Sequence, residues 1–124
     1  MFDRLISNTR REHASAKRAF VVTALLVVGI SLLPGNDLLD IEPWEKAEHI
    51  LAYGVLAFVG VLAFPEGRAT VLLAVFLPVL GVLVELCQIV VPGRSPAIDD
   101  AIANTVGVAL VLIPLFVLRA FRRR

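Results

Sequence analysis

The stretch ATVLLAVFLPVLGVLVELCQIVV, residues 69–91, decides the fold class. Glu85 is its only Asp, Glu, Lys or Arg, and a helix of about 20 apolar residues crosses the ~30 Å hydrocarbon core of a bilayer. Pro78 removes one backbone hydrogen bond, which membrane helices tolerate where neighbouring groups satisfy the freed carbonyl. We therefore predict a membrane-spanning helix over this stretch.

Three more apolar segments flank this stretch, separated by short runs of helix breakers. Pro65–Arg68 divides it from the preceding segment, and Pro92–Pro96 divides it from the following one. A further apolar run, Ala19–Leu33, follows the basic N-terminal residues. The predicted spans are residues 17–35, 46–64, 69–91 and 100–121.

Composition fits this pattern and limits the size of the fold. The chain has 124 residues, is 58% hydrophobic and has a mean hydropathy of +0.84, against roughly 45–50% apolar residues in soluble domains. We predict an all-α membrane protein, a bundle of four transmembrane helices forming one domain over residues 1–124. The single cysteine, Cys87, excludes an internal disulfide, and we interpret it as a packing residue.

Charge predicts the orientation of the bundle. Five Lys or Arg residues precede the apolar run Ala19–Leu33 and four lie from Arg119 onward, while each stretch between the apolar runs has one. The positive-inside rule therefore places both termini in the cytoplasm, and residues 34–48 and 92–100 outside a bacterial cytoplasmic (inner) membrane. Because the basic residues follow the membrane topology, they indicate no nucleic-acid partner.

A few residues predict how the helices begin and pack. Asp99 or Asp100 is a candidate N-cap for the last helix. Trp44 suits a membrane interface. The residues expected to allow close helix contact are Gly54, Gly60, Gly81 and Gly107.

Polar side chains form stripes on three of the predicted helices, all near the outer leaflet. A charge at the bilayer centre costs roughly 2.5–3.5 kcal/mol on insertion scales, so such residues are expected to face one another inside the bundle. The stripes, spaced by three or four residues, are Glu45, His49 and Tyr53; Glu85 and Gln88; and Asp100 and Asn104, with Arg94 in the loop above them.

We interpret these stripes as a site that opens outward. Arg94 has the planar fork that binds phosphate or carboxylate, and His49 is the group that titrates near neutral pH. The candidate proton-transfer residues are His49, Glu85 and Asp100, and the candidate substrate-binding residues are Glu45, Lys46, Tyr53, Gln88, Arg94 and Asn104. The alternative is a structural lock, in which these side chains satisfy one another and fix the helix register.

Metal binding is a less favoured interpretation of the same residues. His49, Glu45, Glu85 and Asp100 could meet around an ion, but zinc normally takes several His or Cys ligands. The only other histidine, His13, lies in the N-terminal tail. We therefore predict no metal and no cofactor.

The same residues resemble a known family. The stretch from Trp44 through His49 to Tyr53, Glu85-x-x-Gln88, Pro92-Gly-Arg94 and Asp100-x-x-x-Asn104-x-x-Gly107 are similar to motifs of the VanZ-like family of small bacterial membrane proteins. The resemblance covers about residues 40–110. Glu45 stands where the family usually has Asp.

The resemblance implies a role in the cell envelope. The family's named member is associated with low-level resistance to teicoplanin, which acts outside the membrane on lipid-linked cell-wall precursors. We predict that the chain contacts membrane lipids and binds a lipid-linked or other amphiphilic substrate; the residues leave open a reaction on it and the oligomeric state. The alternatives are a non-catalytic scaffold or partner subunit and, less favoured, a small-solute transporter.

Overall fold

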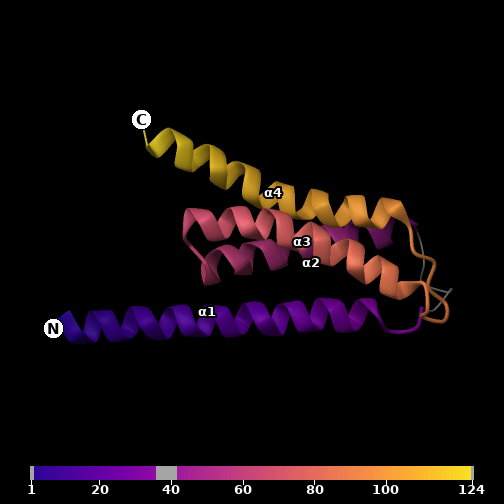
Figure 1. Cartoon of the computed structure of the whole chain (residues 1–124), viewed down its shortest axis with the longest axis horizontal. Helices are drawn as coiled ribbons and strands as arrows, with labels where there is room; N and C mark the ends of the chain where they lie inside the picture. Colours follow the sequence, from indigo (N-terminus) through magenta and orange to yellow (C-terminus); the bar gives the residue numbers. More distant parts are fainter. Residues whose placement is uncertain (1, 36–41, 124) are drawn as a thin grey trace.

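Four α-helices make up the computed structural model, which describes the backbone of residues 2–35 and 42–123 and the side chains of residues 10–35 and 44–123. The helices are α1 (Phe2–Ser31), α2 (Glu42–Ala63), α3 (Gly67–Gln88) and α4 (Ile98–Arg122) (Figure 1). Each is long and apolar enough to cross a membrane, and the described residues contain no strand. The prediction of an all-helical membrane protein with four transmembrane helices is confirmed.

Helix α1 is longer than the predicted first span of residues 17–35. It begins at Phe2 because no glycine or proline interrupts the sequence before Gly29, and its membrane-crossing part is Arg10–Ser31. It ends ahead of Pro34, which cannot continue a helix. The acidic residues Asp37 and Asp40 of the predicted outer loop lie outside the described residues.

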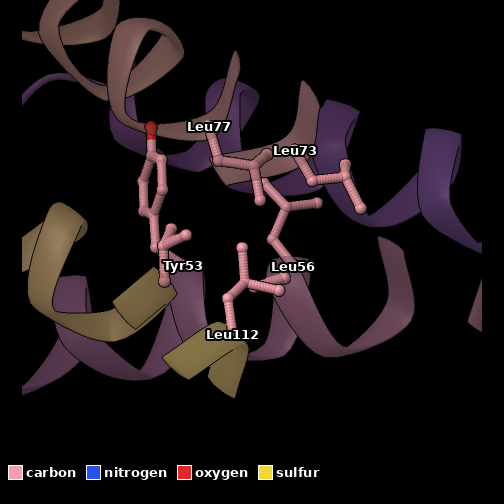
Figure 2. Packing of buried hydrophobic residues seen from close by; sticks show 7 residues of the cluster. Tyr53, Leu56, Leu73, Leu77 and Leu112 are labelled. Atoms are coloured by element: carbon pink, nitrogen blue, oxygen red, sulfur yellow. The ribbon is translucent and has the colours of Figure 1, made fainter. Parts of the chain in front are cut away.

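Helix α2 is the centre of the bundle. It packs most extensively against α4 and also contacts α1 and α3, whereas α1 makes no contact with α4 among the described residues. A buried cluster joins α2, α3 and α4, and Figure 2 shows its side chains facing one another. The residues of this cluster are Tyr53, Leu56, Ala57, Leu73, Leu77, Val108 and Leu112.

The outward faces of the helices are apolar. Leu25, Phe58, Leu72 and Ile113 are each more than half exposed, one on each helix. In a bilayer such side chains face lipid, which is as apolar as the protein core. Cys87 also lies on the exposed face of α3, so its interpretation as a packing residue is wrong.

Glycine allows the tight contact between α2 and α4. A Cβ at Gly107 would collide with the backbone oxygen of Ile50 and lie 3.0 Å from the backbone nitrogen of Gly54. Gly81 leaves similar room on α3, where a Cβ would lie 2.9 Å from the amide nitrogen of Asn104. These glycines bring the polar stripes of α2, α3 and α4 close together.

The start of α4 differs from the prediction. Its N-cap is Ala97, with extended backbone and no side-chain capping bond, and Asp99 and Asp100 lie inside the first turn. The backbone N–H of Ala97 instead donates to Oε2 of Glu85 at 3.2 Å. Neither aspartate is therefore the N-cap, and Glu85 of α3 satisfies the N–H of the residue that is.

The opposite end of the bundle, where both described chain ends lie, is fastened by Arg119 (Figure 1). Its guanidinium donates to Oγ1 of Thr70 at 2.8 Å and to the carbonyl of Pro65 at 2.9 Å. These bonds tie α4 to the start of α3 and to the short connection that precedes it. At the same end, Lys17 of α1 lies 5.5 Å from the ring centroid of Phe64.

Candidate functional site

The site is built on a hydrogen bond between α2 and α4. Nδ1 of His49 lies 2.9 Å from Oδ1 of Asn104, and Nε2 of His49 lies 3.8 Å from Oδ2 of Asp100. Asp100 and Asn104 are one helical turn apart, so both face the same imidazole. The structure thus brings together three residues that the sequence placed on two separate stripes.

Glu45 joins this group from one turn earlier in α2. Single ligand atoms of Glu45, His49 and Asp100 all lie within 4.8 Å of one another. Glu45 and His49 are partly exposed, whereas Asp100 is buried. The arrangement therefore has an accessible side and a closed side.

Glu85 lies on the closed side. It is only 6% exposed, and it interacts electrostatically with Asp100, His49 and Glu45. One carboxylate oxygen accepts the N–H of Ala97, while the other, Oε1, makes no hydrogen bond. Glu85 thus links the start of α4 to the acidic side of the site.

Two further buried polar atoms among the described residues make no hydrogen bond: the hydroxyl of Tyr53 and Nδ2 of Asn104. Figure 2 shows the Tyr53 hydroxyl pointing away from Leu112, out of the apolar cluster. A buried donor or acceptor without a partner costs about 1–3 kcal/mol. These two atoms and Oε1 of Glu85 are therefore buried hydrogen-bonding atoms that a bound group could satisfy.

Gln88 and Arg94 bond to the end of α1. Nε2 of Gln88 donates to the carbonyl of Ser31 at 2.8 Å, and Nε of Arg94 donates to the carbonyl of Leu33 at 3.1 Å. The last carbonyls of a helix have no partner within it, so Gln88 satisfies that of Ser31, and Arg94 bonds to the chain two residues after the helix end. Gly35 adds a backbone bond to Pro92 at 3.2 Å, which holds the two loops together.

Lys46 forms an ion pair with Asp99. Its Nζ is 3.2 Å from Oδ2 of Asp99, and both side chains are largely exposed. Adjacent aspartates therefore have different surroundings, because the Asp99 side chain is 66% exposed and that of Asp100 is 7% exposed. Lys46 and Asp99 lie at the rim of the site.

A cavity of about 220 Å³ opens between α1 and α2 beside these residues. Five of the predicted site residues line it: Glu45, His49, Tyr53, Gln88 and Arg94. The other lining residues are Thr23, Leu26, Val27, Ile30, Ser31, Trp44, Glu48 and Ala52. Glu85, Asp100 and Asn104 do not line it and lie behind His49. The cavity thus has a charged wall from α2 and the 92–94 loop and a largely apolar wall from α1.

Sequence reasoning missed the contribution of α1. Thr23, Val27, Ile30 and Ser31 are spaced by four, seven and eight residues from the first, which places them on one helix face. The hydroxyls of Thr23 and Ser31 both bond within α1, to the carbonyls of Ala19 and Val27. The spacing of Thr23 and Ser31 could have indicated a polar face on α1, although it does not show which helix lies against that face.

Comparison with known proteins places the chain in a family. Residues 5–119 match VanZ/LLP1, which is most of the chain. The chain belongs to the VanZ/LLP1 family. No curated protein and no solved structure matches it. The family match reaches beyond residues 40–110, where the motifs lie, and includes α1, which forms one wall of the cavity.

This VanZ/LLP1 protein is therefore a multi-pass membrane protein of the cell envelope, with three kinds of polar group in one place. Glu45 and His49 face the cavity with Asp100 behind them, a set of groups that can exchange protons or bind a cation. Arg94 lies on the cavity wall with only Nε bonded among the described residues, so its terminal nitrogens can bind an anion. Buried Asn104 fixes the position of the His49 imidazole.

Proposed function

We propose that the chain binds an amphiphilic envelope substrate, a phospholipid or lipid-linked cell-wall precursor, with the headgroup in the cavity and an acyl or prenyl tail along α1. The lining of the cavity carries this proposal. Arg94, Glu45 and His49 form its polar side, and Leu26 and Ile30 of α1 form an apolar side that continues onto the exposed face of α1. An amphiphile in a bilayer offers both kinds of surface at once.

Arg94 is the proposed anchor for a phosphate of the headgroup. Its guanidinium is planar, always charged and able to donate two parallel hydrogen bonds to phosphate oxygens. The bond from Nε to Leu33 holds the side chain in position and leaves the terminal nitrogens for the ligand. His49, backed by Asp100 and Asn104, would exchange a proton with a substrate hydroxyl or phosphate if a reaction occurs.

The proposed site faces the outside of the bacterial cytoplasmic membrane. The excess of Lys and Arg near both chain ends supports this orientation, because the site lies at the opposite end of the bundle (Figure 1). Lipid-linked precursors are displayed on that side, as the resemblance to the teicoplanin-resistance family implies.

Native mass spectrometry of the protein extracted with its lipids tests the proposal. We expect wild type to retain an anionic amphiphile, and Arg94→Gln to lose it. Leu26→Trp, which fills the apolar wall, should also lose it, whereas its neighbour Leu25→Trp, which lies outside the cavity, should not. Arg68→Gln, at the far end of the bundle, controls for lost charge.

Equal lipid retention by all four folded variants would overturn the proposed site. Circular dichroism and gel filtration in detergent establish that each variant is folded. If Arg94→Gln does not fold, the pair of tryptophan variants still decides, because neither residue makes a polar contact in the bundle.

A scaffold function is the second candidate, and the bonds of Gln88 and Arg94 favour it. Gln88 fastens the end of α1 to the end of α3, and Arg94 fastens the loop after α3 to the segment after α1, as expected for a structural lock. In that case a stable membrane protein should copurify with the chain, and Arg94→Gln should reduce the melting temperature without changing the bound lipid.

A further inference from the structure

We propose that Glu45, His49 and Asp100 form a binding site for a divalent first-row metal ion of the zinc class. Two carboxylates and one imidazole, each offering one ligand atom within 4.8 Å of the others, can surround a single ion. Three protein ligands would leave a coordination position open toward the cavity, as in zinc sites that bind a water or substrate.

The distance between His49 and Asp100 suits ligands of one ion better than a hydrogen-bonded pair. Nε2 and Oδ2 are 3.8 Å apart, beyond hydrogen-bond range. Ligand atoms at about 2.0–2.2 Å from a tetrahedral zinc are separated from one another by roughly 3.4 Å. Small rotations of the partly exposed Glu45 and His49 side chains would bring the three atoms to that spacing.

Asn104 orients the imidazole as metal sites require. Its Oδ1 can only accept, so the 2.9 Å bond requires a proton on Nδ1, and in the neutral imidazole the lone pair of Nε2 then faces Asp100. Metal-binding histidines almost always donate their second ring N–H to a carbonyl or carboxylate, which fixes the tautomer. The prediction of no metal rested on the small number of histidines. The hydrogen bond from His49 to Asn104 joins two helices and could not be seen in the sequence.

Glu85 is an independent sign of missing positive charge. Its buried carboxylate lies near enough to interact with Glu45, His49 and Asp100, and its Oε1 has no hydrogen-bond partner. Three carboxylates beside one imidazole repel one another when ionised, and a divalent cation would compensate them. Zinc accepts such mixed nitrogen and oxygen ligands and binds more tightly than manganese at most sites.

The role of the ion rests on the proposed function, but its binding does not. A metal beside Arg94 would supply the second positive contact to a headgroup phosphate, through the open coordination position. The ion would then take the place of His49 as the group that acts on the headgroup, because both ring nitrogens of His49 would be occupied. Metal binding and lipid retention are therefore separate measurements, and either can fail without the other.

Titration of the metal-stripped full chain in detergent with Zn²⁺ tests the site. We expect one equivalent to bind. Loss of a residue that only hydrogen-bonds to a metal ligand weakens metal binding by ~10–100-fold, so Asp100→Asn, which changes a ligand itself, should weaken it by more than about 100-fold. Asn104→Ala, which removes such a hydrogen-bonding partner, should weaken it by ~10–100-fold. Asp99→Asn is the matched control, because Asp99 is adjacent, exposed and paired with Lys46.

Nitrogen-15 NMR of histidine tests zinc binding by His49 without the Asp99, Asp100 and Asn104 variants, so it does not depend on their folding. The chain has two histidines, so in a His13→Asn background the only signal belongs to His49. Zinc should shift the resonance of Nε2 and not that of Nδ1. No shift at saturating Zn²⁺, or equal Zn²⁺ affinity in Asp99→Asn and Asp100→Asn, would overturn the proposal.

The same samples separate the two proposals. Arg94→Gln should keep its zinc and lose the amphiphile. Retention of the amphiphile by zinc-free wild type, with no zinc bound on titration, would reject the metal site and leave the lipid site standing. Zinc binding without any retained amphiphile would reject the lipid site alone.

Discussion

Asn104 holds the candidate site together from α4. The residue is almost completely buried, its amide oxygen bonds to His49, and its amide nitrogen packs against Gly81. A single side chain therefore contacts both α2 and α3 and sets the rotation of the imidazole. Its neighbour Thr105 is exposed and bonds only to the carbonyl of Ala101 in its own helix.

This difference predicts the effect of removing each side chain. Asn104→Ala should reduce the free energy of unfolding by about 0.5–2 kcal/mol, the range of hydrogen bonds measured in membrane proteins. Thr105→Ala should change it by much less. Unfolding by sodium dodecyl sulfate in mixed micelles, followed by circular dichroism, measures both. Equal stability of the two variants would mean that the His49 bond contributes nothing to the fold.

At the scale of helices, the approach of α2 to α4 depends on Gly107. An added methyl group there would meet the backbone of Ile50 and Gly54, which cannot move aside as a side chain can. Gly107→Ala should destabilise the bundle by about 1–3 kcal/mol, the usual cost of overpacking. Gly29→Ala is the control, since nothing lies within 4 Å of a Cβ at that position.

The control should be neutral or slightly stabilising, because alanine favours a helix more than glycine does. Both variants can be compared in the same detergent unfolding assay. If Gly107→Ala is as stable as Gly29→Ala, the contact between α2 and α4 is looser than the structure describes.

At the other end of the bundle, Arg119 stabilises the packing of α4 by hydrogen bonds. Arg119→Ala removes the bonds to buried Thr70 and to the carbonyl of Pro65, so we expect a loss of about 1–2 kcal/mol in the free energy of unfolding. Arg122, three residues later on α4, is exposed and has the same charge. Arg122→Ala should therefore leave the free energy of unfolding unchanged. A similar loss in both variants would attribute the effect to net charge instead.

Helical periodicity explains which parts of the structure could be predicted from sequence. Apolar length gives the four helices, and spacing by four places Glu45 with His49 and Asp100 with Asn104 on shared faces. Those relations lie within one helix, so they survive any packing arrangement.

The contacts between segments could not be predicted in the same way. Gln88 and Arg94 bond to backbone carbonyls of Ser31 and Leu33, and since every residue has a carbonyl, no sequence signal marks these two. The N-cap at Ala97 is similar, because its N–H is satisfied by Glu85 from another helix. Residue type predicted an aspartate cap, but the helix begins at an alanine whose own N–H bonds to a residue distant in sequence.

At the scale of the whole molecule, the proposed site can reach its substrate only if its end of the bundle faces outward. The two ends of the bundle have exposed residues that suit labelling: Ser95 in the loop beside the site, and Glu66 between α2 and α3. The charge distribution predicts that Ser95 is outside and Glu66 is inside. The single native cysteine can be removed by Cys87→Ser.

In that background, a membrane-impermeant maleimide applied to intact bacteria or spheroplasts should label Ser95→Cys and not Glu66→Cys, while both should react after lysis. The reverse pattern would place the cavity on the cytoplasmic side, where Arg94 would meet the headgroups of the inner leaflet instead of displayed cell-wall precursors. Labelling of both positions in intact cells would contradict the four-span arrangement itself, because Glu66 and Ser95 flank α3 and lie on opposite sides of the membrane only if α3 crosses it. The orientation therefore decides which class of amphiphile the cavity can bind before any ligand is identified.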